Sequence, residues 1–459
     1  MKRMIKLLPA LGLLMFSLII AVSCNKVYDE LHDVFDKKPV LSKPANKYSS
    51  DVVVKWLDLK YRIFLQPQVL QRPGTQSFVV RFYGYLGVAL YESAVPGMPS
   101  HQSLSGQLTD MPQMPKPEKG KLYHWPASAN AALAFVHKSF LPNTSAANKL
   151  ALDSLEGALN AQYQTEADAA TIQRSADFGR AVAKLIVDWS ETDGTFAIWP
   201  PYVRPVGPGL WVPTPPNFNE PTGGIYRFGD HRTFVPGVLN EASPPLPPAY
   251  STDPSSDFYK MEKEVYDVSQ TLTSEQNAQA SYWAGTTGGT PAIHWFAILK
   301  KVLVEQSAKL DIAALAYCQM GLAQYDAAIV AAKVKYTYNL LRPATYIRDV
   351  LGHTTWLPSG PGNPNPDWPD SQVPDHSSSA GVLSSVFGKN YHFNTEGTHV
   401  NPARYQGYTF HSFEEAAVHG GTSRFLLGYT TKPAVDAGLS IGFKTVNYMN
   451  NKIKFKKGG

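Results

Sequence analysis

The sequence predicts an all-α protein whose helices are interrupted by one long proline-rich excursion. Apolar residues recur at three-to-four-residue spacing through most of the chain from about residue 51 onward, which is typical of helices with one buried face. Alternating runs typical of strands are few. Between Ile198 and Pro254 the helical spacing stops, because clustered prolines remove the backbone donors that a helix or a central strand needs.

The expected helices follow in order along the chain. Apolar spacing predicts them in RFYGYLGVALYESAV, SANAALAFVHKSFL and FGRAVAKLIVDWSE, and in the long segment from Ala292 to Leu341. After the excursion, Thr273 or Ser274 is placed to cap a helix start. The excursion itself is expected to be ordered and packed over the helical body, because disordered linkers are usually poor in aromatic residues. Its aromatic residues include Trp199, Trp211, Phe218 and Tyr226.

The N-terminus has the pattern of a bacterial lipoprotein signal peptide. A basic stretch, MKRMIKLL, precedes an apolar run that ends at AVSCNK, with a small residue directly before Cys24. We expect residues 1–23 to be removed, Cys24 to carry the lipid, and residues 24–50 to form a polar tether. A transmembrane anchor is the alternative, but the run is shorter than the roughly 20 residues of a span. The mature protein is therefore expected in the bacterial cell envelope, as a periplasmic or outer-membrane lipoprotein held by acyl chains.

Charge and cysteine content limit the other possibilities. The net charge is +5, but lysine and arginine are scattered without a basic block, so no nucleic-acid partner is expected. The chain has two cysteines. If Cys24 is lipidated, Cys318 has no disulfide partner, and its apolar setting, ALAYCQMGLA, predicts a buried structural thiol.

Three segments far apart in the sequence stand out together. In YDAAIVAAKVKYTYNLLRPATYIRD, the spacing of Lys335 and Arg342 predicts that they project from nearly the same helix face, with Arg342 at a helix end before Pro343. The segment WLPSGPGNPNPDWPDSQVPDHSSSAGVLSSVFG is an acidic, proline-broken loop followed by a helix. In the third segment, Arg424 lies between an alanine-rich helix and Gly428. Each segment alone is unremarkable.

In this order the three segments resemble the motifs of the vanadium-dependent haloperoxidases and the type 2 phosphatidic acid phosphatases (PAP2), above all those of a bacterial lipoprotein branch. The family pattern is a Lys separated by six residues from Arg-Pro, then Pro-Ser-Gly-His, then Ser-Arg with a His six residues after the Arg. PAIHWFAILKKV and SFEEAA are similar to further landmarks of that branch. The resemblance implies that residues 51–450 form a domain of two packed helical bundles. Residues 51–250 would be its N-terminal part, and residues 251–450 would carry the pocket.

The resemblance also implies an anion site. In the family, a Lys and two Arg hold a tetrahedral oxyanion, phosphate or vanadate, beside a helix start. Lys335, Arg342 and Arg424 match these cations. The last His of the family pattern attacks phosphorus or ligates vanadium, and the His of Pro-Ser-Gly-His is its acid–base partner.

Both family histidines are replaced in this chain. Counted without a gap from Trp356, Asp370 stands for Ser, Ser371 for Gly and Gln372 for the acid–base His, while Thr430 stands for the last His. Thr430 has no imidazole for vanadium, and Gln372 cannot shuttle a proton at neutral pH.

Two other changes affect the same loop. Asp370 puts a negative charge where the family holds an anion, and it could pair with any of the three cations. Pro374 suits the first turn of a helix, so the helix is expected to begin near Val373 rather than at Ser371. The N–H groups of the anion site would then be displaced.

The sequence therefore predicts a superfamily lipoprotein with impaired catalysis, no expected cofactor or metal, and a small anion or glycan as its candidate ligand. One alternative is an active haloperoxidase or acid phosphatase in which His376, one turn beyond Gln372, serves as the acid–base residue. A hydrolase built on Asp370 is another. A third is an envelope module that binds a glycan or protein through its proline-rich segment. His294 and His419 are further candidates to replace the missing imidazoles.

Overall fold

The computed structural model describes residues 42–66, 75–221, 225–284, 290–360, 364–399 and 403–458. The predicted signal peptide, Cys24 and most of the predicted tether lie outside these residues. Lys43–Pro117 and Tyr123–Gly459 form one compact unit. The all-α prediction is confirmed, because the only sheet in the described part of the chain pairs two short strands, β1 (Phe393–Asn394) and β2 (Thr409–Phe410).

Side chains cap the start of several helices. The α-helices are α2 (Asp51–Phe64), α4 (Thr75–Ala94), α5 (Trp125–Phe140), α6 (Ala146–Tyr163), α7 (Ala169–Ser190), α8 (Val238–Glu241), α9 (Asp257–Gln270), α10 (Ser274–Ala284), α11 (Pro291–Glu305), α12 (Leu310–Tyr338), α13 (Pro343–Asp349), α14 (Val373–Phe387), α15 (Phe413–Leu426) and α16 (Lys432–Lys452). Short 3-10 helices are η1 (Ala45–Lys47), η2 (Val95–Gly97) and η3 (Ile225–Asp230). Thr273, rather than Ser274, caps α10, because its hydroxyl accepts the N–H of Gln276 while the Gln276 side chain accepts the N–H of Thr273.

Helix α12 is the buried axis of the compact unit. Small and apolar residues cover its whole circumference, and it is buried along nearly its entire length. A Cβ at Gly321 would lie 2.4 Å from the backbone oxygen of Tyr83, so glycine lets α4 cross α12 closely. Inside the unit, the amide of Gln324 donates to the hydroxyl of Ser379 on α14 at 2.7 Å. This long helix therefore links two groups of helices.

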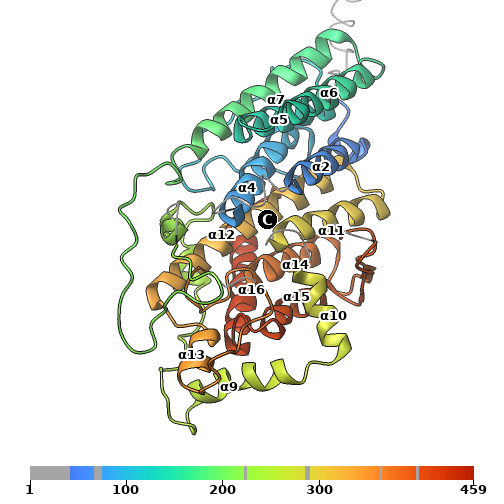
Figure 1. The fold of residues 1–459 in the computed structure, drawn as a ribbon. Helices are drawn as coiled ribbons and strands as arrows, with labels where there is room; N and C mark the ends of the chain where they lie inside the picture. The colour runs from blue at the N-terminus through green and yellow to red at the C-terminus, as the bar shows by residue number, and fades with distance from the viewer. Residues whose placement is uncertain are drawn as a thin grey trace, which may run out of the picture. The chain divides into compact units, whose positions relative to one another are not determined.

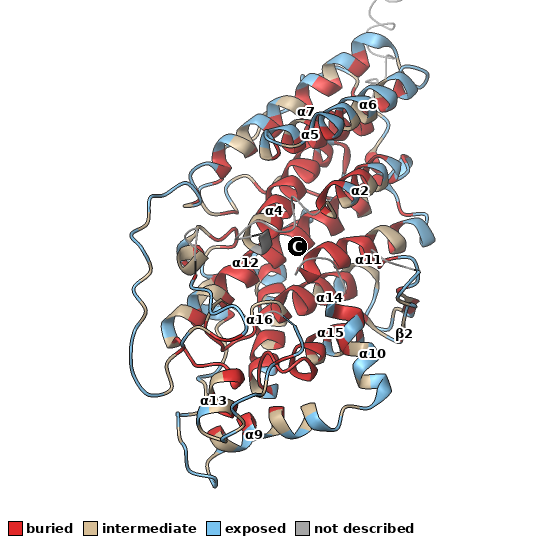
Figure 2. Ribbon diagram, in the orientation of Figure 1, coloured by how far each residue is buried: buried red, intermediate tan, exposed pale blue. Residues whose placement is uncertain are grey.

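Figure 1 shows these two groups on either side of α12. Helix α4 packs along α12 and against α5, which packs in turn against α6 and α7. Helices α14 and α16 pack on α12 and on each other, and α15 packs on both. Buried residues concentrate along α4, α12 and α14, whereas α6 and α7 expose one face (Figure 2). The candidate site lies in the group formed by α12–α16.

The proline-rich excursion is ordered along part of its length. Trp211 is buried, and its backbone N–H donates to the carbonyl of Asn339 at 2.7 Å. Near the end of the excursion, the Asp326 carboxylate of α12 accepts the N–H of Phe234 at 2.7 Å. Ile198, in contrast, is 99% exposed. The expected packing over the helical body therefore holds at Trp211 and Phe234, whereas Ile198 is open to solvent.

Cys318 is buried in α12, and burial raises the pKa of its thiol well above the usual value. The predicted structural thiol is confirmed. Among the described residues, no helix has both the length and the apolar character that a membrane span requires.

Candidate functional site

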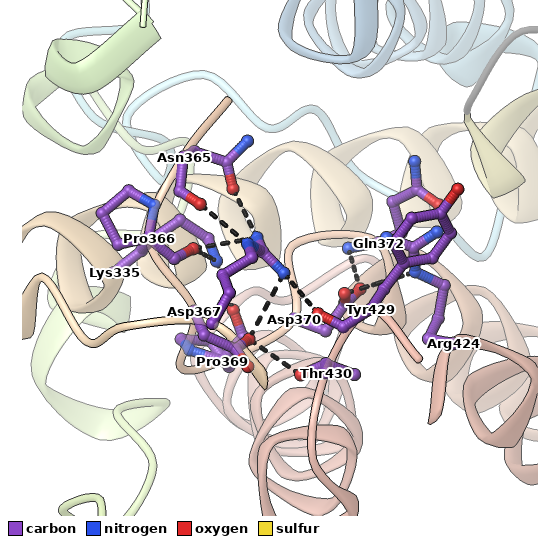
Figure 3. Close-up of polar contacts among 11 residues, drawn as sticks. Lys335, Asn365, Pro366, Asp367, Pro369, Asp370, Gln372, Arg424, Tyr429 and Thr430 are labelled. Carbon is purple, nitrogen blue, oxygen red and sulfur yellow. Dashed lines mark hydrogen bonds and ion pairs between the residues drawn. The ribbon is translucent and has the colours of Figure 1, made fainter. Parts of the chain in front are cut away.

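Three cationic side chains from separate elements meet around the loop of residues 365–372 (Figure 3). Lys335 lies in the last turn of α12, Arg342 directly precedes α13, and Arg424 lies in the last turn of α15. The prediction that Lys335 and Arg342 share a helix face is wrong. Helix α12 ends at Tyr338, and Asn339, with a φ of 47°, turns the chain before Arg342. The cations nevertheless converge, because tertiary packing brings their three elements to one loop.

The Lys335 amine is buried and held by the backbone of this loop. Its Nζ donates to the carbonyl oxygens of Pro366 at 2.7 Å and Pro369 at 2.6 Å. Burial, followed by repulsion from Arg342, lowers the pKa of Lys335 to about 7, although nearby carboxylates oppose the shift. The amine therefore gains and loses its charge near neutral pH.

The Arg342 guanidinium is fully engaged by oxygen atoms of the chain. Its Nε donates to the carbonyl of Asn365 at 2.8 Å, and its Nη2 donates to the Asn365 side chain at 2.7 Å and the Pro366 carbonyl at 2.9 Å. Its Nη1 donates to the Tyr429 carbonyl at 2.9 Å and lies 3.6 Å from a carboxylate oxygen of Asp367. These contacts fix the loop and leave the guanidinium no donor directed at open space.

Asp370 is fully buried and pairs with Arg424. The Arg424 Nε lies 3.2 Å from each carboxylate oxygen, and the N–H of Gln372 donates to Oδ1 at 2.9 Å. Burial alone would raise the pKa of Asp370, but Arg424, then Arg342 and Lys335, outweigh it and hold the pKa below the usual value. The carboxylate is therefore ionised at neutral pH, and Arg424 is the cation that it contacts.

Thr430, at the position of the last family His, is buried and already hydrogen-bonded. Its hydroxyl donates to Oδ1 of Asp367 at 2.7 Å. The sequence analysis did not predict Asp367 as a site residue, although it lies in the acidic, proline-broken loop beside Asp370. A buried carboxylate needs a partner, but nothing in the local sequence marks Asp367 as buried.

Helix α14 begins at Val373 with Pro374 in its first turn, as predicted. Gln372 is the N-cap residue, and its side chain makes no capping hydrogen bond. Ser371 precedes the helix and lines a cavity of about 70 Å³ together with Lys335. Pro374 has no N–H group, and the N–H of Asp375 donates to the carbonyl of Gln372 at 3.2 Å, so neither residue offers an anion the N–H donor that a helix start usually supplies.

His376 lies in the first turns of α14, and its ring is engaged by neighbouring helices. The indole N–H of Trp295 donates to Nδ1 at 2.9 Å, so the neutral ring carries its proton on Nε2. A Cβ at Gly420 would lie 2.4 Å from the imidazole, so the ring packs directly on the backbone of α15. Burial, followed by the charge of Arg424, lowers the pKa of His376 to about 3. The imidazole is a weak base at physiological pH.

The other two histidine candidates also have packing contacts. The indole N–H of Trp283 donates to Nδ1 of His419 at 2.8 Å, and Nε2 of His294 lies 2.8 Å from the hydroxyl of Thr398. Burial lowers the pKa of both histidines. Neither hydrogen-bonds to the three cations or to Asp370.

A second acid that sequence reasoning missed comes from α9. Glu262 is fully buried, and within the described part of the chain neither of its carboxyl oxygens has a hydrogen-bond partner. Burial, followed by the charge of Asp367, raises the pKa of Glu262 well above its usual value. Burial without a partner therefore favours the uncharged form of Glu262.

Comparison with solved structures identifies this arrangement of helices. A structure described as the first bacterial vanadium-dependent iodoperoxidase matches with a TM-score of 0.77 and 26% identity, over 91% of this chain and 99% of that chain. The chain belongs to the vanadium haloperoxidase/PAP2 superfamily.

Two more distant structures share the superfamily fold. They are a holo-type bacterial vanadium-dependent chloroperoxidase, with a TM-score of 0.61 and 14% identity, and an apo-type one, with 0.62 and 15%. The matches cover 85% of this chain and 94% of the holo-type chain, and 90% of this chain and 100% of the apo-type chain. No protein-family model and no curated protein matches the sequence.

The superfamily relatives correct the expectation of no cofactor. The similar structures are those of vanadium-dependent enzymes, so that expectation is wrong for this fold. Lys335, Arg342 and Arg424 have the charge that a tetrahedral oxyanion takes, but the donors of Lys335 and Arg342 are occupied by oxygen atoms of the chain. Thr430 does not fit the ligating role, because it offers a hydroxyl in place of an imidazole nitrogen. The three cations are present, but each is already bound to oxygen atoms of the chain, and Arg424 is bound to those of Asp370.

Proposed function

We propose that this chain is an envelope lipoprotein of the vanadium haloperoxidase/PAP2 superfamily with impaired catalysis. The observation that carries the proposal is the contact between Asp370 and Arg424, because a carboxylate of the chain engages a cation that the family pattern directs at an oxyanion. The residues at the two histidine positions support it. Gln372 cannot titrate, and the Thr430 hydroxyl is committed to Asp367.

Proton transfer is the step for which the site is least suited. A carboxylate such as that of Asp367 is far too weak a base to activate the Thr430 hydroxyl as a nucleophile. His376, with a pKa of about 3, is a weak base whose Nδ1 is already occupied by Trp295. Lys335 titrates near neutral pH, but it donates to two carbonyl oxygens. These contacts favour impaired catalysis over an active site rearranged around His376 or Asp370.

An activity comparison with vanadate supplied tests the proposal. Wild type and Lys335→Ala are assayed with peroxide plus iodide or bromide, and with p-nitrophenyl phosphate, beside an active vanadium-dependent iodoperoxidase. Impaired catalysis predicts background rates for both proteins in both assays. A rate above background that Lys335→Ala abolishes would establish an active enzyme.

The envelope location rests on the signal-like N-terminus and Cys24. Labelling of growing cells with an alkyne fatty acid tests it. Wild type should carry the label and sediment with membranes, whereas Cys24→Ala should lose the label and leave the membrane fraction. Equal labelling of the two proteins contradicts lipidation at Cys24.

A second candidate function is binding of a saccharide, favoured by a groove of about 470 Å³ between the excursion and α12. The rings of Tyr202, Tyr226 and Tyr336 meet in this groove, with centroids 5.3–6.4 Å apart. Arg227 and Lys333, both in contact with Asp230, add polar groups to its lining. Such a groove offers apolar faces for a sugar ring and hydrogen-bonding groups for its hydroxyls.

Titration of maltose, cellobiose and chitobiose, followed by intrinsic fluorescence, tests this second function. Binding should be lost in Tyr202→Ala and kept in Phe218→Ala, which changes an exposed aromatic residue of the same excursion. Absence of binding at millimolar sugar, or equal binding by both variants, contradicts it.

A further inference from the structure

The two short strands place a pair of histidines opposite each other on the surface. Phe393 pairs with Phe410 in the antiparallel register, and both rings are buried. The next pair outward along the hairpin is His392 and His411. Because successive side chains of a strand point to opposite faces, the two histidines must face solvent if the phenylalanines face the core. Both histidines are exposed, as this alternation requires.

The distance between the two imidazoles suits a shared metal ion. Their ring centroids lie 5.0 Å apart, with an angle of 78° between the ring planes. An imidazole nitrogen binds zinc at about 2.0–2.1 Å, which places the ring centroid roughly 3.2 Å from the metal. Two such rings at a ligand angle of roughly 90–110° would have centroids about 4.5–5.2 Å apart. The observed separation falls in this range, so the two exposed rings need only turn about their side-chain bonds, from the edge-to-face contact seen here, to bind one ion.

The surrounding structure holds the two histidines in place. Phe393 contacts Phe413 at the start of α15, with centroids 4.7 Å apart, and this contact anchors β1. Next to β2, the carboxylate of Glu415 accepts the backbone N–H of His411, and Ser412 caps the same helix. A metal would therefore bind to a backbone that is already ordered, which lowers the entropic cost of binding.

We propose that His392 and His411 form a surface site for a divalent first-row transition metal, bound through two imidazole nitrogens with water as the remaining ligands. Among the described residues no group of three or more His, Cys, Asp or Glu side chains is arranged to hold a metal, so two protein ligands define this site. Such a site prefers Cu²⁺ over Ni²⁺ and Zn²⁺, because imidazole affinity follows that order. It is separate from the oxyanion cluster and does not depend on the proposed function.

Calorimetric titration of Cu²⁺ and Zn²⁺ into the full chain, purified without a polyhistidine tag, tests the site. His392→Asn and His411→Asn should each weaken Cu²⁺ binding about tenfold or more. The control is His353→Asn, which changes a half-buried histidine stacked on Tyr266. Binding should also weaken at pH 5, because protons compete for imidazole. Equal Cu²⁺ affinity of wild type and His392→Asn at pH 7.5 overturns the proposal, as does an equal loss in the control.

Discussion

The carboxylate of Asp370 presents both oxygens to Nε of Arg424, each at 3.2 Å, in a site from which water is largely excluded. The three cations that match the family pattern thus have a carboxylate of the chain itself among them. The loop of residues 365–372 is held by this pair and by the hydrogen bonds of Lys335 and Arg342 to its backbone. These contacts therefore contribute to the stability of the fold.

Asp370→Asn should lower the free energy of unfolding at pH 7 by about 3 kcal/mol, because it leaves the Arg424 charge in a mostly buried position without its counter-ion. The native pKa of Asp370 is held low, so its contribution is present above the unfolded pKa of about 4 and is lost as the pH falls through the native value. Urea unfolding between pH 7 and pH 3 checks both statements. Asp349→Asn, at an exposed position, is the control, and a wild-type advantage that persists unchanged at pH 3 would contradict the assignment.

Lys335 should make stability rise with pH between about 7 and 10. Its native pKa of about 7 lies below the unfolded value of about 10.4, so the unfolded state binds more protons in this window. The slope from this residue approaches about 1.4 kcal/mol per pH unit. Denaturation of wild type and Lys335→Met between pH 7.5 and pH 10 measures the difference. Parallel stability curves would show that the lysine is charged in the native state.

Thr430 and Asp367 should be energetically coupled. Thr430→Val removes the hydroxyl that donates to Oδ1 of Asp367, and we expect a loss of about 1–3 kcal/mol. A double-mutant cycle with Asp367→Asn isolates the pair. The double mutant should lose about 1 kcal/mol less unfolding free energy than the sum of the two single losses. Strict additivity of the two single changes is the outcome that this contact does not allow.

Gly428 should tolerate no side chain. Its φ is 76°, and a Cβ there would lie 2.9 Å from the Trp356 ring. Gly352 has a similar φ of 81° but open space around it, so Gly352→Ala reports the backbone strain alone. Thermal unfolding should show that Gly428→Ala costs about 1 kcal/mol or more beyond Gly352→Ala. Equal losses would mean that the Trp356 contact relaxes freely.

The sequence predicts those parts of the fold and site that depend on local pattern. The apolar spacing of α4, α5, α7 and α12 reflects buried faces and survives in the structure. Lys335, Arg424 and Asp370 were found because the family frame fixes their order along the chain. The start of α14 followed from Pro374, whose effect on a helix is local.

Contacts between residues far apart in the sequence were not predicted, or their partners were left undecided. Asp367 and Glu262 carry no local sign that they become buried beside the cluster, because their burial comes from packing of loop and helix. The turn at Asn339 separates Arg342 from α12, since a left-handed residue ended a helix that the apolar spacing would have continued. Tertiary geometry also decides which of the three cations pairs with Asp370.

Calorimetric titration of vanadate into wild type and Asp370→Ser at pH 7.5 tests the central claim most directly, namely that Asp370 competes with an oxyanion for Arg424. Removing the carboxylate should free the guanidinium, so Asp370→Ser should bind vanadate at least about tenfold more tightly than wild type. Asp349→Ser, which removes an exposed carboxylate, should match wild type. Equal affinity of Asp370→Ser and wild type, with both proteins folded by circular dichroism, would contradict the account.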